Sequence, residues 1–434
     1  MTSVTLPLHQ QTYSLQHDRF RDLLAHSENI LIIQDLDGVC MGLVKDPLNR
    51  VIDTAYVEAT RAFNGHFFVL TNGEHVGQRG VNGIIERAYG NPQRVKEQGL
   101  YLPGLAAGGV QWQDRQGRLD HPGVSDQEMA FLGAVPTKIR QRLQTFVDSH
   151  ALPLDADTIE HCIDASSLDN IASPTANLNT FHGALQNHMD TYRALQREMH
   201  ALMEELLEEA RQQGLGDSFF IHYAPNHGRG ADGKEIVWYS QGQESGTTDF
   251  QFMLRGAIKE AGVLALLNRY YARRIGEFPL GSAFSVRQAP HSHGELLALV
   301  EQQFDPAYMP ILVGVGDTIT SKVDQVDGQP LAKRGGSDRN FLQLVQDIGR
   351  RFQTGNVVAY VDSSGGELKN RKALKLVNQG TQPQVVEGPG DPLDTADPLT
   401  LNVVFPGGHR EYIHSFCQAA RQRPQVAPPG SAPR

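Results

Sequence analysis

Two carboxylates separated by one residue stand directly after an apolar run near the N-terminus. Residues 29–34 are β-branched or apolar for most of their length, and Asp35, Leu36, Asp37 and Gly38 follow. Such a run predicts a buried parallel strand with a loop at its carboxyl end. Two carboxylates held close together repel each other and favour a hard cation such as magnesium, which prefers oxygen ligands. We therefore expect a metal site at Asp35 and Asp37; the alternative is that Asp37-Gly38 is an ordinary turn after a strand.

Polar residues follow two further apolar runs. Thr71 and Asn72 come after residues 67–70 and offer a hydroxyl, an amide and backbone N–H groups without adding charge, which suits an anion held beside a carboxylate. Asp317 comes after residues 311–315 and would add a third carboxylate. Each signal alone is common in loops, but parallel strands bring their carboxyl ends to one edge of a sheet. Together they predict one site there.

A lysine could balance these charges. Lys259 falls within an amphipathic pattern from about residue 252 to 272, which predicts a helix. Its ammonium group could offset both the carboxylates and a bound phosphate. The alternative is a solvated lysine on a helix surface, which is the commoner fate of this residue type.

The elements that must position these residues alternate along the chain. Apolar strands are predicted at residues 29–37, 67–70, 311–315 and 357–361, and helices at about 252–272 and at 339–352, the second with Ser337 or Asp338 as its N-cap. Alternating strands and helices predict an α/β fold with a doubly wound parallel sheet, whose ligands bind at the carboxyl ends of the strands.

The middle of the chain has a different pattern. Residues 108–121 predict a hairpin that turns at Gln116 and Gly117, and residues 182–213 predict a long helix with one apolar stripe, which we expect to cover a sheet. Residues 217–225 and 234–241 flank a turn that contains Gly228, Gly230 and Gly233, and predict a second hairpin.

These patterns divide the chain. We expect an α/β cap domain at 124–246, inserted into a discontinuous core of residues 1–123 and 247–434. Residues 380–398 and 423–434 are rich in proline and glycine and are expected to be flexible.

Composition excludes several classes of protein. Among 434 residues, 39 lysines and arginines face 49 aspartates and glutamates, and the net charge of −10 argues against a general binder of nucleic acid or of anionic membranes. The three cysteines, Cys40, Cys162 and Cys417, are too few and too widely separated for a disulfide framework or a paired-cysteine zinc site. No apolar run has the length of a signal peptide or a membrane span. We expect a cytoplasmic protein.

Four segments resemble, in order, the motifs of the haloacid dehalogenase superfamily of phosphohydrolases. They are Asp35-Leu36-Asp37-Gly38-Val39, Leu70-Thr71-Asn72, Lys259 and Gly316-Asp317-Thr318. The resemblance implies a Rossmannoid core with a cap domain between the second and third motifs.

The resemblance also implies a role for each residue. Asp35 would attack phosphorus to form an aspartyl-phosphate, and Asp37 would protonate the leaving alcohol and then activate water. Magnesium would be held by the Asp35 carboxylate, the Asp37 backbone carbonyl and the Asp317 carboxylate. Thr71 and Lys259 would hold the phosphoryl oxygens, with Asn72 beside them.

The sequence departs from the pattern in two places. The fourth motif usually has a second acid four residues after the first, but Ser321 stands there and the next acid is Asp324. The separation between Lys259 and Asp317 is also long, so residues 287–300 are read as an inserted loop and helix.

The residues in and around these motifs further resemble those of phosphatases of bacterial osmolyte synthesis. This resemblance implies a phosphorylated glycoside as the substrate and the enzyme that makes that glycoside as a partner. Two alternatives stay open. One is a phosphatase for another sugar phosphate, of the sucrose phosphate or mannosylglycerate phosphate type. The other is a non-catalytic regulator that binds a sugar phosphate, although such a protein would be expected to lose Asp35 or Asp37.

Overall fold

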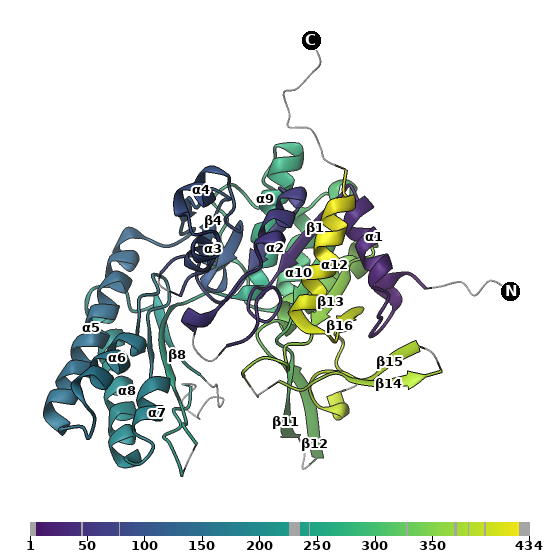
Figure 1. Ribbon diagram of the computed structural model, residues 1–434. Helices are drawn as coiled ribbons and strands as arrows, with labels where there is room; N and C mark the ends of the chain where they lie inside the picture. Colours follow the sequence, from purple (N-terminus) through teal and green to yellow (C-terminus); the bar gives the residue numbers. More distant parts are fainter. Residues whose placement is uncertain are drawn as a thin grey trace. The chain divides into compact units, whose positions relative to one another are not determined.

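An eight-stranded, mostly parallel sheet forms the centre of the larger part of the chain (Figure 1). The computed structural model describes residues 6–44, 47–77, 79–224, 235–242, 244–326, 329–368, 371–380, 382–394 and 396–424. The strand order is β16-β13-β10-β1-β2-β3-β4-β5. Neighbouring strands are parallel from β16 to β3, and β4 and β5 are antiparallel. Their bounds are β1 Ile30–Gln34, β2 Phe67–Leu70, β3 Gly104–Ala106, β4 Gln111–Gln113, β5 Leu119–Asp120, β10 Ile311–Gly316, β13 Val357–Val361 and β16 Val403–Phe405.

The four apolar runs of the sequence are the four adjacent parallel strands β13, β10, β1 and β2. Every residue of β1, β2 and β13 is buried, as expected for strands covered on both faces. The hairpin predicted around Gln116 and Gly117 is also present, because β4 pairs with β5 through Trp112 opposite Asp120. The predicted doubly wound α/β class is confirmed.

Two groups of helices cover the sheet (Figure 1). The helices α1, α2 and α12 pack on one another, and α9, α10 and α11 form the second group. The helices of this part of the chain are α1 His17–His26, α2 Thr54–Ala59, α3 Val81–Tyr89, α4 Pro92–Glu97, α9 Lys259–Ile275, α10 His293–Gln303, α11 Arg339–Phe352 and α12 Gly408–Gln422. The 3₁₀ helices are η1 Leu8–Gln10, η2 Pro47–Asn49, η3 Thr60–Phe63, η4 Ala107–Gly109, η5 Val286–Gln288, η6 Pro306–Tyr308 and η7 Pro392–Asp394.

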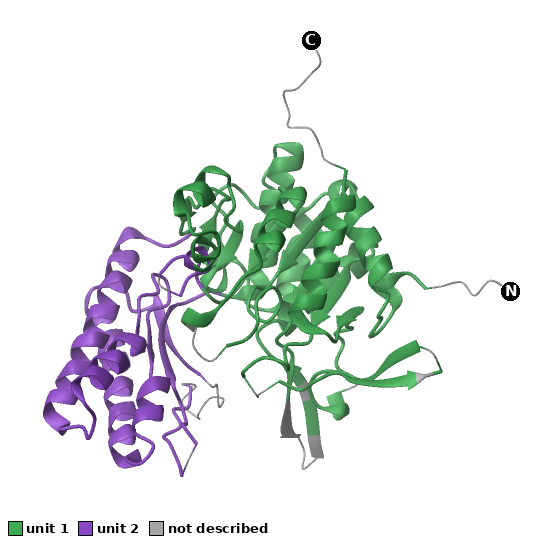
Figure 2. Cartoon of the chain, in the orientation of Figure 1, with its two compact units in different colours: residues 1–73, 84–122, 258–434 green, residues 74–83, 123–257 purple. Residues whose placement is uncertain are grey.

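The chain forms two compact units (Figure 2). Unit 1 comprises residues 1–73, 84–122 and 258–434, and unit 2 comprises residues 74–83 and 123–257. The division differs from the expected cap of residues 124–246 in two places: residues 74–83, which the sequence places in the core, belong to unit 2, and the C-terminal boundary lies later. Residues 247–257, which we assigned to the core, belong to unit 2 because they contain a strand of its sheet.

Unit 2 is an α/β unit built on a four-stranded antiparallel sheet of order β6-β7-β9-β8. The long helix α8 packs on α5 and on strands of this sheet, as expected for the apolar stripe of residues 182–213. The elements are α5 Asp126–His150, α6 Ala156–Ser166, β6 Ser167–Leu168, β7 Thr175–Asn177, α7 Asn179–Ala184, α8 Met189–Gln212, β8 Phe219–Ala224 and β9 Asp249–Leu254.

Two local predictions in this region are wrong. Residues 251–254 belong to β9 and not to a helix, and α9 begins only at Lys259. The side chains of β9 alternate, with Phe250, Phe252 and Leu254 buried, which is the period of a half-buried strand. Residues 234–241, predicted as the second strand of a hairpin with residues 217–225, form no strand within the described range 235–242, and β8 pairs with β9 along its whole length. The turn predicted at Gly228, Gly230 and Gly233 lies outside the described residues.

Residues 380–398 carry more regular structure than their composition predicts. They contain most of a second antiparallel hairpin, β14 Lys375–Gln379 with β15 Gln382–Glu387, and the short helix η7. The carboxylate of Asp394 in η7 is buried and forms an ion pair of 3.1 Å with Arg334, which offsets the loss of chain entropy. Of the tail at 423–434, Arg423 is buried, and residues 425–434 lie outside the described residues.

Two further findings concern the chemistry of the chain as a whole. All three cysteines are buried free thiols. In the part of the chain that the structure describes, none of the helices combines the length and the apolar character needed to cross a bilayer.

Candidate active site

The candidate site lies at the carboxyl edge of the parallel sheet, in unit 1. β1 pairs with β10 so that Gln34 lies opposite Val315, and Asp35 continues this ladder by donating its N–H to the Val315 carbonyl at 2.9 Å. Because both strands end at the same level, Asp35 and Asp317 leave the sheet side by side. The fold therefore brings together carboxylates that the sequence separates widely.

Lys259 is buried between two of these carboxylates. Its Nζ lies 3.0 Å from Oδ1 of Asp35 and 2.5 Å from Oδ1 of Asp338. The lysine is the first residue of α9, and only 4 % of its side chain is exposed. A solvated lysine, the alternative left open above, is excluded.

Asp338 connects the lysine to the end of β10. Its second oxygen, Oδ2, accepts hydrogen bonds of 2.9 Å from the backbone N–H groups of Asp317 and of Thr318. Asp338 stands at the N-cap position of α11, but its side chain forms no capping hydrogen bond. Its carboxylate binds Lys259 and the backbone at Asp317 and Thr318 and does not cap the helix.

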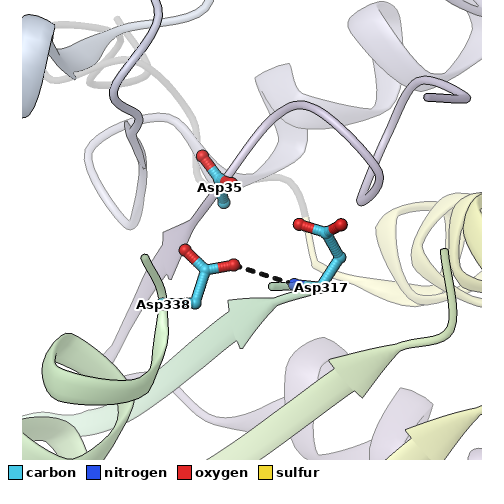
Figure 3. Close-up of side chains that lie close together, drawn as sticks. All are labelled: Asp35, Asp317 and Asp338. Carbon is cyan, nitrogen blue, oxygen red and sulfur yellow. Dashed lines mark hydrogen bonds between the residues drawn. The ribbon is translucent and has the colours of Figure 1, made fainter. Parts of the chain in front are cut away.

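The pKa values follow from this burial and from the clustering of like charges (Figure 3). Burial, together with the charges of Asp338 and Asp37, raises the pKa of Asp35 to about 7, although Lys259 opposes the shift. Burial likewise raises the pKa of Asp317 well above its usual range, and the charges of Asp338 and Asp35 add to this effect. Burial alone would lower the pKa of Lys259, but the charges of Asp338 and Asp35 outweigh it and raise that pKa.

A glycine makes room for the Asp317 carboxylate. Gly38 has a φ of +78°, and a Cβ atom at this position would lie 2.2 Å from Oδ2 of Asp317. Only glycine adopts this backbone conformation readily and leaves this space open. The Asp37-Gly38 turn is thus needed for the carboxylate to stand where it does.

The carboxylate of Asp37 lies apart from this cluster. Its Oδ1 forms an ion pair of 3.0 Å with Nε of Arg50, and 26 % of the side chain is exposed. Exposure leaves it accessible to a substrate, while only 9 % of the Asp35 side chain is exposed. The two aspartates thus differ in environment, as expected of residues with different roles.

Thr71 and Asn72 have different surroundings. Thr71 is buried at the end of β2, and its hydroxyl accepts a hydrogen bond of 3.2 Å from the N–H of Gly73. A Cβ on Gly73 would lie within 4 Å of both Oγ1 of Thr71 and Oδ2 of Asp37, so the Thr71 hydroxyl is near the carboxylate of Asp37. Asn72 is exposed.

Sequence reasoning missed Asp338. The motif pattern places a second acid close behind Asp317. Ser321, which stands at that position, forms a hydrogen bond with Asp394 instead. The side chain of Asp324, the next acid, lies outside the described residues. The chain first makes an antiparallel hairpin, β11 Thr320–Val326 with β12 Gln329–Gly335, and then returns to the site at Asp338. The signal for this hairpin was the dipeptide Asp327-Gly328, which favours a tight turn; both residues lie outside the described part of the chain.

The cluster has the composition of a site for a divalent cation. Asp35, Asp317 and Asp338 each offer one carboxylate oxygen, and these atoms lie within 4.8 Å of one another. All three carboxylates are buried, and Lys259 supplies only one positive charge against them. A hard divalent cation would satisfy both the charge and the oxygen ligands, so the residues present fit such an ion.

A parallel α/β sheet with a buried cluster of acids and a lysine at its carboxyl edge is the arrangement expected of an enzyme that acts on phosphate esters, which is the class that the motifs resemble. A family model described as "Glucosylglycerol-phosphate phosphatase (Salt_tol_Pase)" matches residues 29–420. A curated relative from Synechocystis sp. (strain ATCC 27184 / PCC 6803 / Kazusa), named glucosylglycerol-phosphate phosphatase, is 58% identical over 416 residues, which cover 96% of this chain and 98% of the relative. The chain belongs to the glucosylglycerol-phosphate phosphatase family.

Similar solved structures are more distant. A trehalose-6-phosphate phosphatase of Aspergillus fumigatus aligns with a TM-score of 0.37 and 9% identity, covering 94% of this chain and 99% of that one. The C-terminal domain of a trehalose-6-phosphate phosphatase of C. albicans aligns with a TM-score of 0.42 and 10% identity, covering 94% and 98%.

Proposed function

We propose that this protein is a magnesium-dependent phosphatase that hydrolyses 2-O-(glucosyl)-glycerol 3-phosphate to glucosylglycerol and phosphate, in osmolyte synthesis under salt stress. Family membership supports the substrate class, and the site supports the chemistry. The observation that carries the chemistry is the burial of Lys259 between Asp35 and Asp338, because a paired ammonium beside a carboxylate is what attack on an anionic phosphate ester requires.

Asp35 is the proposed nucleophile. Its carboxylate attacks phosphorus, an O–P bond forms to Asp35, and the bond from phosphorus to the glycerol oxygen breaks. Lys259 lies 3.0 Å from the attacking group and favours its ionised form, and it can also neutralise charge on the phosphoryl oxygens.

Asp37 is the proposed acid and base. In the first step its proton goes to the departing glycerol oxygen. In the second step it takes a proton from water as the water attacks phosphorus, which breaks the aspartyl-phosphate and regenerates Asp35. Its side chain is partly exposed, so it can reach both the leaving group and water, unlike the buried Asp35.

The remaining residues bind or position. Asp35 and Asp317, with the backbone carbonyl of Asp37, are the proposed ligands of magnesium, which when bound would neutralise the negative charge shared by carboxylates and phosphate. Asp338 holds Lys259 and the backbone at Asp317, and the Thr71 hydroxyl, with Asn72 beside it, is the proposed contact to a phosphoryl oxygen.

Two wider proposals follow from the family. The proposed partner is glucosylglycerol-phosphate synthase, the enzyme that supplies the phosphorylated glycoside. The proposed compartment is the cytoplasm, because the three cysteines are free thiols. Deletion of the phosphatase gene should leave the phosphorylated glycoside to accumulate in salt-stressed cells.

A substrate panel tests the proposal. The purified protein with magnesium is assayed for phosphate release from 2-O-(glucosyl)-glycerol 3-phosphate, sucrose 6-phosphate, mannosylglycerate phosphate and trehalose 6-phosphate. We expect kcat/KM to be at least about 100-fold higher for the first, since specificity is a ratio of transition-state binding. A higher value for any of the others would refute the substrate assignment, and release that persists unchanged after removal of all divalent metal would refute the metal dependence.

A further inference from the structure

A basic cavity lies at the end of the sheet opposite the catalytic carboxylates. It measures about 1000 Å³ and is lined by residues of α2, η3, α9 and α12 and by the turn between β4 and β5. His66 and Arg115 line it; His66 directly precedes β2, whereas Thr71 directly follows it. The cavity therefore borders the amino ends of the strands, and it belongs wholly to unit 1.

Five arginines line this cavity against a single carboxylate. The lining contains Arg61, Arg115, Arg273, Arg421 and Arg423. Among the described residues, only Arg61 of these five forms an ion pair, with Glu58 at 3.1 Å. The lining thus has a surplus of four positive charges, although the chain as a whole has a net charge of −10.

Two of these arginines are buried and have no carboxylate partner within the described part of the chain. Arg115 is 8% exposed, and its guanidinium donates to Oδ1 of Asn64 and to the hydroxyl and carbonyl of Thr60, at 2.7–3.1 Å. Arg423 is 9% exposed and donates to the carbonyls of Leu24 and Ser27. A buried charge that has only neutral partners costs folding free energy unless an opposite charge compensates it.

The positive charges are also close enough to disfavour one another. Burial, together with the charges of Arg61 and Arg273, lowers the pKa of Arg115 to about 10. Burial also lowers the pKa of His66, and the charges of Arg423 and Arg273 act in the same direction. An anion in the cavity would relieve this repulsion.

Helix dipoles do not account for the cluster. Arg273 and Arg421 lie in the last turns of α9 and α12, where a basic residue is favourable in any helix. Arg115, however, lies on a hairpin turn between strands, and Arg61 lies on η3. The convergence of all five on one hollow needs another explanation.

We propose that this cavity is a second, non-catalytic site that binds a small phosphate-bearing anion with more than one negative charge. Guanidinium groups pair with phosphate oxygens in a bidentate manner. A volume of about 1000 Å³ is that of a small-molecule pocket, and a hollow on an acidic chain suits a compact anion better than a nucleic acid, which the rest of the surface would repel. The proposal does not depend on the identity of the catalytic substrate.

The site has a structural connection to the catalytic centre. Lys259 is the first residue of α9, and Arg273 is in its last turn. At 1.5 Å per residue, one helix spans the roughly 20 Å between them. An anion bound at Arg273 would therefore contact the same helix that positions the catalytic lysine.

Binding of pyrophosphate to the metal-free protein tests the proposal, because without magnesium the carboxylates of the active site repel the probe. Titration calorimetry should show binding that weakens as salt concentration rises. The double variant Arg273→Gln/Arg421→Gln should weaken it by at least about tenfold, since each charge-assisted contact contributes about that much. The matched control is Arg350→Gln/Arg351→Gln, which removes two exposed arginines from the last turn of α11 and should leave binding unchanged.

Absence of binding in the wild type, equal binding by the double variant, or tighter binding of citrate or of a single-stranded oligonucleotide would overturn the proposal. A second measurement on the wild type does not depend on how the variants fold. Pyrophosphate should protect Arg273 and Arg421, but not Arg350, from phenylglyoxal modification as read by mass spectrometry; equal modification with and without pyrophosphate would also overturn it.

Discussion

The carboxylate of Asp338 accepts a 2.9 Å hydrogen bond from the backbone N–H of Asp317, although 21 residues separate the two in sequence. The same carboxylate accepts a hydrogen bond from Nζ of Lys259, which in turn contacts Asp35. Four residues from three distant segments thus form one connected group, so a change at any of them should be felt at the others.

Asp35→Asn should abolish turnover while leaving the fold intact. An amide is not a nucleophile toward phosphorus, so kcat should fall by at least about 1000-fold, as measured by phosphate release. Rapid acid quench should trap a phosphorylated aspartate in the wild type and not in Asp35→Asn. Undiminished activity in the variant would exclude the covalent mechanism.

Asp338→Asn should lower kcat about 100-fold without abolishing magnesium binding. The variant keeps a hydrogen-bond acceptor for Asp317 but loses the charge that fixes Lys259. The matched control is Asp347→Asn on the same helix, where the carboxylate pairs with His293 and Arg350. Equal kcat for Asp338→Asn and the control would show that Asp338 does not position the lysine.

Lys259→Met should destabilise the metal-free protein. Removing one partner of a buried ion pair costs about 3–5 kcal/mol, because the carboxylates are left uncompensated. Chemical denaturation should show this loss, and magnesium should restore part of it by supplying positive charge. If magnesium gives the variant no more stability than it gives the wild type, the lysine does not compensate the carboxylates.

The stabilisation that magnesium gives should grow as pH rises. Because the pKa of Asp35 is raised from 3.8 to about 7 in the folded protein, its contribution to stability is complete below about pH 4 and is lost as pH rises through 7. Magnesium binds the ionised carboxylate, so the increase in melting temperature on adding magnesium should be larger at pH 8 than at pH 5.5. Asp35→Asn should reduce this difference, and Asp317, whose pKa is also raised, should account for the remainder; an unchanged difference in the variant would show that Asp35 does not contribute to it.

Gly38→Ala should weaken magnesium binding without changing any charge. Its new methyl group would meet Oδ2 of Asp317 at 2.2 Å, on a backbone with positive φ, so the carboxylate must move. Titration of magnesium should show an affinity at least about tenfold lower. Gly294→Ala, where the structure leaves open space around the added Cβ, should bind magnesium as the wild type does.

The sequence predicted the parts of the site that local patterns encode. Apolar runs ending in acids identified β1 and β10, and hence the neighbourhood of Asp35 and Asp317, because strand ends are marked in the sequence itself. The start of α9 was misplaced because Phe250, Phe252 and Leu254 are apolar in either a strand or a helix, and only the pairing of β9 with β8 decides between them.

Asp338 was beyond local reasoning for a different reason. Its role depends on contacts with Asp317 and Lys259, which are made only once the hairpin of β11 and β12 has formed. In the sequence it looks like a helix cap. The boundary of unit 2 was likewise set by a strand pairing that no single segment reveals.

The hairpin of β11 and β12 has a consequence for how the chain can vary in length. Thr320 lies opposite Gly335, so the chain leaves the catalytic edge and returns to it at neighbouring points. Ser321 and Arg334, the next pair, bond to Asp394, so we expect changes in length to leave Asp317 and Asp338 in place only when they fall beyond that pair, where a reporter peptide could be inserted. Distance along the chain between two acids is thus a poor guide to whether they serve one site.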